Sequence, residues 1–244
     1  MFTIHTAKTN DEKEEIYRFR YKIYIEELKK LHFVADHNKK QLYDEADNYC
    51  AVYYVKNNDG IIGTCRAIRG TDGQFTESDI SIFNISFIEQ FIEHEKIAVV
   101  NRLIIDKSYR HTNLVHQLFL ESYLGGLKEG TRICFVTCDS MLLHMYIKYG
   151  FRTFSDPVQL NNKQTRFLLF LSLCDLSYLK SINSPFVPYL PTELDDHGFY
   201  AKKMETEGGF NLSLRKPPVK DRILYGVAKT IFKLQSKAKK IFSL

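Results

Sequence analysis

The sequence contains no tryptophan, and its five cysteines (positions 50, 65, 134, 138 and 174) form no CxxC pair and no Cys/His spacing typical of a zinc site. No apolar run reaches the roughly 18 residues of a membrane-spanning helix. The N-terminus lacks the charged segment and the apolar segment of a secretory signal. We therefore expect a cytoplasmic protein with reduced cysteines in its core, no metal site and no tightly bound cofactor.

The residues that are present predict a large core followed by a basic end. Hydrophobic residues make up 44% of the 244 positions, and they include 15 Tyr and 18 Phe. Residues 219–244 carry seven Lys or Arg and one Asp, a net charge of +6, whereas the remainder carries 27 basic and 28 acidic residues, a net charge of −1. We expect a domain over residues 1–175 and an extension over 176–244. We expect no nucleic-acid partner, because no recognised nucleic-acid module accompanies the basic end.

Hydrophobic periodicity predicts an α/β sandwich built on a mixed sheet. Asp59-Gly60 predicts a hairpin between two early strands. Thr9-Asn10-Asp11 has the composition of a cap for a long first helix. Residues 165–175 are nearly all apolar, so we expect this strand at the centre of the sheet. The expected strands are 2–6, 48–56, 61–69, 99–106, 131–139 and 165–175, and the expected helices are 12–31, short segments within 74–94, 114–127 and 140–150.

Residues 99–139 read as a βαβ unit, and the turn inside it is a candidate anion site. The turn, Lys107–Asn113, is basic and has neither a P-loop lysine motif nor GxGxxG. Its usable groups are backbone N–H donors and the N-terminus of the following helix, which together suit a pyrophosphate. The alternative is a basic helix cap without a ligand.

This turn resembles the pyrophosphate loop of the GNAT acyltransferase superfamily, with Arg110 at its first position and Asn113 where glycine is usual. Asparagine tolerates a left-handed backbone, so we expect the loop to form. The segment Tyr146–Phe151 (YIKYGF) completes the likeness. The resemblance implies a GNAT-like mixed β-sheet flanked by helices, acyl-CoA or acyl-phosphopantetheine as co-substrate, and Tyr146 as the acid that protonates the leaving thiolate. A tyrosine of an apolar helix face is the alternative. The residues that the resemblance implies at the thioester are Leu103, Ile104, Ile105, Arg110, His111, Thr112, Asn113, Leu114 and Val115.

Residues 5–155 are also similar to a narrower group within this superfamily. The likeness rests on the segments 18–28, 44–47, 63–66 and 99–102. They resemble the autoinducer synthases that make acyl-homoserine lactones, and the related N-acyl amino acid synthases. These families transfer a long acyl chain from acyl carrier protein, or sometimes CoA, to the amine of an amino acid or its derivative. The charged cluster that the resemblance implies on the acceptor side is Arg20, Asp44, Asp47, Arg66 and Arg102.

The charged residues also make physical sense without the resemblance. Asp44 and Asp47, at i and i+3, can present two carboxylates to an ammonium and orient it or take its proton. Arg66 and Arg102 lie in apolar strands and need partners, since unpaired buried charge is costly. The cluster is therefore structural, functional or both.

The sequence departs from the family pattern at two positions. The family's glutamate three residues before Arg102 is Val99 here, which argues against S-adenosylmethionine as the acceptor. The family's usual tryptophan after helix one is absent, and Phe33 is the nearest substitute.

These observations predict an N-acyltransferase that moves an acyl group, expected to be long-chain, to the amine of an amino acid or related small molecule. The Phe-rich segments 75–91 and 167–171 either line an acyl tunnel or fill a core. An acetyl-CoA-dependent N-acetyltransferase and a non-catalytic membrane- or carrier-binding module are the alternatives, and Cys138 with His144 as a nucleophile pair is a weaker one. The basic helix expected over 219–244 can dock on its own domain, on the anionic inner face of the cell membrane, or on an acidic carrier protein.

Overall fold

One sheet of eight strands organises the protein, whose computed structural model describes residues 2–159 and 165–212. The strand order is β1-β4-β5-β6-β7-β10-β8, with β9 paired to β10, and only β6 and β7 run parallel. The predicted mixed α/β fold is confirmed, whereas the predicted helix over 219–244 lies outside the described residues. The strands are β1 (His5–Thr6), β4 (Ala51–Asn57), β5 (Gly60–Arg69), β6 (Ile97–Ile105), β7 (Ile133–Cys138), β8 (Arg152–Thr153), β9 (Val158–Gln159) and β10 (Thr165–Ser172), besides the separate pair β2 (Ala35–Asp36) and β3 (Gln41–Leu42).

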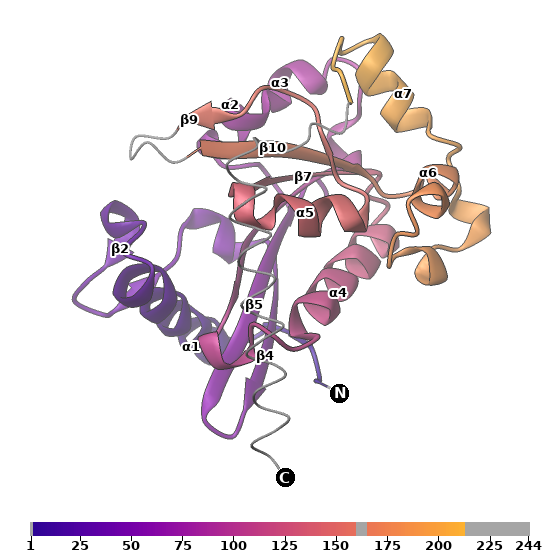
Figure 1. The fold of residues 1–244 in the computed structure, drawn as a ribbon. Helices are drawn as coiled ribbons and strands as arrows, with labels where there is room; N and C mark the ends of the chain where they lie inside the picture. Colours follow the sequence, from indigo (N-terminus) through magenta and orange to yellow (C-terminus); the bar gives the residue numbers. More distant parts are fainter. Residues whose placement is uncertain (1, 160–164, 213–244) are drawn as a thin grey trace.

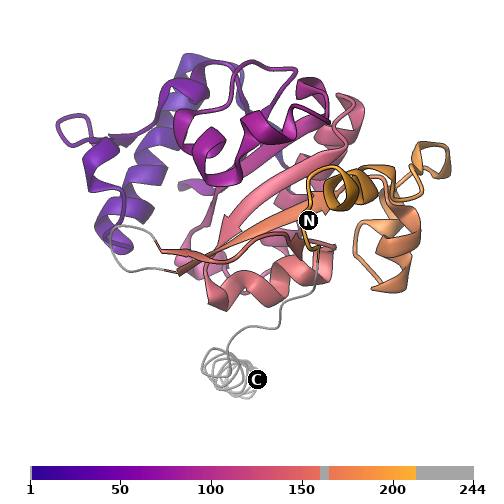
Figure 2. The ribbon, with the colours of Figure 1, turned by 90° about the horizontal axis from the view of Figure 1, so that it is seen from above.

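Helices cover both faces of this sheet, as the two views in Figures 1 and 2 show. Among the described residues, no helix is both long and apolar enough to cross a membrane. The α-helices are α1 (Asn10–Tyr21), α2 (Glu77–Phe83), α3 (Ile85–Ile88), α4 (Leu114–Lys128), α5 (Ser140–Tyr149), α6 (Leu176–Ser181) and α7 (Phe199–Thr206).

The first helix begins where its cap predicts and changes character before its expected end. Thr9 accepts from the N–H of Glu12, and the Glu12 carboxylate accepts from the N–H of Thr9 at 2.9 Å, which completes a capping box. From Lys22 the helix continues as a π-helical turn, η1 (Lys22–Glu27). The predicted helix to residue 31 is therefore too long. π-Helical turns are rare and occur frequently at functional sites.

The hairpin and the last long strand show where local signals suffice and where they do not. Asn57 pairs with Gly60 across the predicted turn, and Gly60 adopts φ 120°, which favours glycine. The 165–175 strand is an interior strand, as expected, but it lies next to the end of the sheet rather than at its middle. β10 pairs with β7 on one side and only with the two-residue strands β8 and β9 on the other. Its apolar sequence reflects packing on both faces, because Leu169 and Phe170 belong to cores on opposite faces of the sheet.

Two main cores sandwich the sheet between its helices. One core joins α4 and α5 to the sheet, and the other joins α2, α3 and α7 to the opposite face. Phe75 and Phe83 lie in the second core, so the 75–91 segment fills a core at these positions. Residues of α6 and α7 also pack into these cores, which ties residues 176–212 to the main domain.

Candidate active site

The sheet opens between its two parallel strands. β6 and β7 pair only from Ile97 to Val99, opposite Ile133 to Phe135. Beyond these residues β6 continues to Ile105 and β7 continues to Cys138, but the two strands no longer pair with each other. Backbone N–H and C=O groups that face an opening of this kind are available to a ligand, because each must find a partner when buried.

A β-bulge lies on the β6 side of this opening. Thr64 pairs with Ile104 while Arg66 pairs with Asn101, so β6 carries one extra residue in this interval. Arg102 lies in it and adopts φ 54°, a left-handed conformation that is unusual for a non-glycine residue. Bulges of this kind redirect side chains and are common next to active sites.

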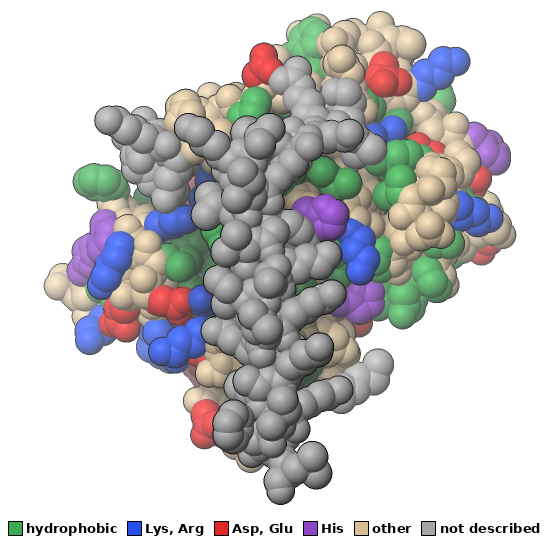
Figure 3. Space-filling model, in the orientation of Figure 1, with side chains coloured by type: hydrophobic (Ala, Val, Ile, Leu, Met, Phe, Trp, Pro, Cys, Tyr) green, Lys and Arg blue, Asp and Glu red, His purple; other side chains and the backbone are tan. Residues whose placement is uncertain are grey.

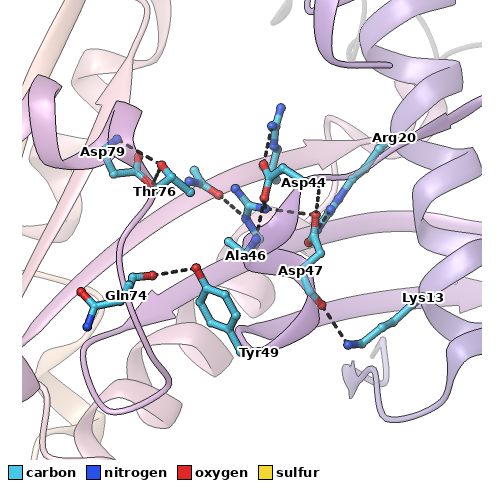
Figure 4. Close-up of polar contacts among 12 residues, drawn as sticks. Lys13, Arg20, Asp44, Ala46, Asp47, Tyr49, Gln74, Thr76 and Asp79 are labelled. Atoms are coloured by element: carbon cyan, nitrogen blue, oxygen red, sulfur yellow. Dashed lines mark hydrogen bonds and ion pairs between the residues drawn. The ribbon is translucent and has the colours of Figure 1, made fainter. Parts of the chain in front are cut away.

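The five charged residues predicted from the sequence form one network, partly shown in Figure 4. Arg20 from α1 donates to Asp47 at 2.7 Å, and Arg66 from β5 donates to the other Asp47 oxygen at 3.1 Å. Arg66 also donates to Asp44, and Arg102 from the bulge donates to the second Asp44 oxygen at 3.0 Å. The short 3₁₀ turn Glu45–Asn48 holds both aspartates, since Asp44 caps this turn and its N–H donates to Asp47.

The two aspartates differ in their access to solvent. Asp47 is completely buried, and three donors occupy its carboxylate. The Asp44 side chain retains 28% of its exposure. Burial raises the pKa of Asp44, but its hydrogen bond and charge interaction with Arg66, and the charge of Arg102, outweigh burial and lower the pKa to about 2. Asp44 is therefore an ionised carboxylate that a ligand can approach.

The network holds one more positive charge than negative, and two nitrogen atoms of one arginine lack hydrogen-bond acceptors in the part of the chain that the structure describes. Arg20 is fully buried, and its Nε and Nη2 atoms find no hydrogen-bond acceptor among the described residues. A buried donor without an acceptor is costly. Three guanidinium groups against two carboxylates give this side of the site a positive character that suits a ligand with an acidic group.

Tyr146 lies in the α4–α5 core, close to the opening. Its ring packs edge-on against Phe119 at 5.2 Å and against Phe151 at 5.3 Å between centroids. Burial raises its pKa well above the usual value. No hydrogen bond of its hydroxyl is found among the described residues, so this O–H is available to a ligand. Tyr146 is thus a neutral phenol in a firmly packed position.

The predicted pyrophosphate turn has an exposed helix N-terminus but a different arginine geometry from the one expected. His111, Thr112 and Asn113 are exposed, and Asn113 precedes α4 without a side-chain cap. Asn113 adopts φ −81°, so the left-handed conformation that we expected there is absent. Arg110 is held by Glu27 and by the carbonyl of Ile105 at 3.0 Å. The turn is therefore fastened to the π-helical turn η1.

A cavity of about 440 Å³, counted with the part that opens to solvent, lies between α4 and the sheet. Ala98, Val100 and Cys134 line it beside the paired part of β6 and β7. Phe119, Phe151 and Leu171 contribute apolar walls, so of the predicted Phe-rich segments only the second reaches this cavity, through Leu171.

Sequence reasoning missed three parts of this arrangement. Asn101 accepts from Arg66 Nε at 2.8 Å, and the Tyr24 ring lies 5.7 Å from the Arg102 guanidinium carbon. Burial raises the pKa of Tyr24 and Arg102 opposes this shift. Asp139 binds Arg166 at 2.9 Å and Lys30 at 3.6 Å across neighbouring elements. Tyr24 lies four residues after Arg20, a helical spacing that places both side chains on one face, so its position could have been predicted. The contacts of Asn101 and of Asp139 depend on tertiary structure and could not.

Two other sequence candidates take positions away from the chemistry. Phe33 does not line the site, since its side chain is fully exposed. Cys138 is buried, and burial raises its pKa to about 12, which disfavours the thiolate that a nucleophile needs. Val99 is buried in the α2–α3 core, where the apolar side chain fits.

Comparisons with known proteins agree with this geometry. Residues 19–120 match the family model of the acetyltransferase (GNAT) domain. BjaI, a CoA-dependent acyl-homoserine lactone synthase solved with MTA, superposes with a TM-score of 0.58 and 16% identity over 76% of this chain and 91% of its own. This chain has a GNAT fold. The predicted resemblance to the autoinducer synthases is confirmed at the level of the fold.

Further GNAT-fold structures give the same result. FeeM, an N-acyl amino acid synthase from uncultured soil microbes, has a TM-score of 0.58 and 13% identity over 78% of this chain and 99% of its own. TofI, solved in a ternary complex with an inhibitor and MTA, has a TM-score of 0.55 and 13% identity over 80% of this chain and 99% of its own. The search of curated protein sequences finds no match. At these identities the likeness establishes the architecture, and the reaction must be argued from the site.

Proposed function

We propose that the protein is an N-acyltransferase that moves an acyl group from a thioester to the amine of an amino acid or related small molecule. The observation that carries this proposal is the separation of β6 from β7 beside a buried arginine–aspartate network, with an apolar cavity next to the paired part of these strands. The opening provides backbone donors for a thioester, the network provides charge for an amine, and the cavity presents an apolar lining that suits an acyl group.

On the donor side, the thioester would enter between the parted strands. Its phosphate or phosphopantetheine end would lie at the N-terminus of α4, over the turn Arg110–Val115, where backbone N–H groups favour an anion. The carbonyl would meet backbone N–H groups of β6 around Leu103–Ile105, which stabilise the negative charge that develops on the oxygen. One of the solved GNAT-fold relatives, BjaI, was solved with SAM and isopentyl-CoA, which supports an acyl-CoA as a donor for this architecture.

On the acceptor side, Asp44 is the carboxylate that meets the substrate. It is partly exposed and ionised, so it can orient an ammonium group. A pKa of about 2 makes it a weak base at neutral pH, so the ammonium would lose its proton to water before attack. We assign buried Asp47 to holding Arg20 and Arg66 in place. The excess positive charge favours an acceptor that also carries a carboxylate, which an amino acid does.

The reaction then requires one bond to form and one to break. The neutral amine attacks the thioester carbonyl, forms the C–N bond and gives a tetrahedral intermediate. Collapse breaks the C–S bond, the nitrogen loses a proton to solvent, and the sulfur gains one. Tyr146 would donate that proton from its neutral phenol and regain one from solvent, because its raised pKa favours the protonated form. The products are an N-acyl amide and a free thiol.

The second candidate is an acetyl-CoA-dependent N-acetyltransferase. The fold is common to both reactions, and an acetyl group needs no extended apolar space. The aromatic lining of the cavity, which includes Phe119 and Phe151, suits an apolar acyl group. Filling the cavity by Ala98→Phe distinguishes the two, because a long-chain enzyme should shift to shorter donors while an acetyltransferase should keep its donor preference.

The direct test offers the purified chain acyl-CoA and acyl carrier protein donors of increasing length with a mixture of amino acids. Free thiol and product mass are recorded together. The proposal expects thiol release that depends on the amine and a product whose mass equals acyl plus amino acid less water. Thiol release without an amine would indicate a hydrolase. Absence of turnover with every donor and amine would favour the non-catalytic module.

A further inference from the structure

Residues 28–43, which we call the apolar loop, expose an unusual number of large apolar side chains. Nine such side chains are exposed among the described residues, and five of them belong to this loop. Phe33 is fully exposed at 105% and Val34 is 51% exposed. Leu28, Leu31 and Tyr43 are the others in the loop. Leaving this much apolar surface in water is unfavourable, so an apolar projection of this kind marks an interaction surface.

The loop combines these apolar side chains with positive charge. It contains four lysines and one aspartate. Lys30 pairs with Asp139, whereas Lys29, Lys39 and Lys40 are exposed and have no ion-pair partner within residues 2–159 and 165–212. Asp36 is occupied, because it accepts from the N–H groups of Asn38 and Lys39 at 3.0 and 2.9 Å. The exposed charge on the loop is therefore positive.

The apolar loop is held in a defined shape that points Phe33 outward. The strand pair β2–β3 closes it, and His37 links the Tyr21 hydroxyl and the His32 carbonyl, each at 3.0 Å. Lys29, Leu31 and Lys40 adopt φ values of 54°, 60° and 50°, and such strain persists only where the surroundings impose it. The exposure of Phe33 is thus a feature of an ordered loop.

The figures place this loop at the margin of the molecule. In Figure 1 the β2 region projects beyond the sheet and its flanking helices, and Figure 2 shows the same projection from above. At the left edge of Figure 3, over this region, hydrophobic, histidine and Lys or Arg side chains lie next to one another at the surface. A projecting apolar tip flanked by positive charge is complementary to the interface of an anionic bilayer.

We propose that the apolar loop docks on an anionic lipid surface. Phe33, Leu31 and Val34 would enter the boundary between headgroups and acyl chains, and the unpaired lysines would contact lipid phosphates. Basic residues near an anionic bilayer and apolar side chains at its interface act together in peripheral binding. This inference does not depend on the proposed reaction, and it rests on residues 28–43 alone.

The absence of tryptophan makes a direct test available. Phe33→Trp gives the full-length chain a single indole at the tip, and Tyr189→Trp gives a matched control at another exposed aromatic position. Each variant is titrated with vesicles of phosphatidylcholine alone or with about one third phosphatidylglycerol. For Phe33→Trp we expect a blue shift of the indole emission and quenching by brominated lipid, only with the anionic vesicles. For Tyr189→Trp we expect no change in emission with either vesicle.

A binding measurement completes the test. Phe33→Ser should weaken co-sedimentation of the full-length chain with anionic vesicles by about ten- to a hundredfold, because burial of a Phe side chain is worth that much in partition. Tyr189→Ser should leave it unchanged. Binding that Phe33→Ser leaves intact would assign the lipid contact to another surface and overturn the inference. An absence of vesicle binding would also overturn the inference. The same holds if the Phe33→Trp emission shifts only in a parallel titration with an acidic carrier protein and not with vesicles.

Discussion

Asp47→Asn should destabilise the protein more than any other single change in the charged network. Asp47 is completely buried and lies between Arg20 and Arg66, at 2.7 and 3.1 Å. Asn keeps the shape but removes the charge, and its amide NH₂ would face guanidinium donors. Removing one partner of a buried ion pair costs about 3–5 kcal/mol, a large share of the roughly 5–15 kcal/mol that stabilises a typical domain.

Urea unfolding followed by circular dichroism measures this effect. With a slope near 3 kcal/mol per molar urea, the midpoint should fall by about 1–1.7 M while the slope stays constant. Asp44→Asn is the matched control, because its partly exposed carboxylate should cost only about 1–2 kcal/mol and should instead raise the KM for the amine. An Asp47→Asn variant within about 1 kcal/mol of the parent would refute the structural assignment and return Asp47 to the acceptor site.

Three further predictions address the donor side and the periphery. Tyr146→Phe should lower kcat by about ten- to a thousandfold with little change in stability or KM, and an unchanged kcat at every pH would make water the proton donor. Arg110→Ala should weaken thioester binding measured by calorimetry. Glu27→Gln removes the ion-pair partner of Arg110. It should tighten thioester binding if Arg110 contacts the phosphate, and weaken thioester binding if the Arg110–Glu27 pair only positions the turn. Burial lowers the pKa of His94, but its hydrogen bonds to Glu89 and to a backbone carbonyl outweigh this and raise it. The stabilisation is therefore complete below about pH 6.5 and is lost as pH rises through the raised folded pKa, so urea midpoints at about pH 5.5 and 8.5 should differ in the parent more than in His94→Gln.

The sequence was sufficient for the elements whose signals are local. The capping box at Thr9 and the turn at Gly60 depend on side chains within three or four positions, and both are where the pattern predicts. The charged network was also predictable, because an arginine such as Arg66 in an apolar strand requires a nearby carboxylate. Which aspartate is sealed and which is open was not predictable, because that follows from the packing of α1 against the 3₁₀ turn at Glu45–Asn48.

The remaining features depend on tertiary structure that periodicity does not carry. β10 lies next to the end of the sheet, yet it has the composition of a central strand because apolar cores pack on both of its faces. The π-helical turn that aims Tyr24 at Arg102 has no local signature in the sequence. The backbone at Asn113 is right-handed, so the residue replaces glycine there without requiring the conformation that glycine supplies.

The measurement that tests the central claim most directly is mass spectrometry of lipid extracts from cells that express the protein. The comparison needs three samples, namely the parent chain, Tyr146→Phe and an empty vector. The account predicts N-acylated amines, with a fatty acyl group on an amino acid or a related molecule, that are abundant with the parent chain, reduced with Tyr146→Phe and absent with the vector. Equal lipid profiles in all three, at matched soluble expression, would contradict the claim that this fold transfers acyl groups to amines.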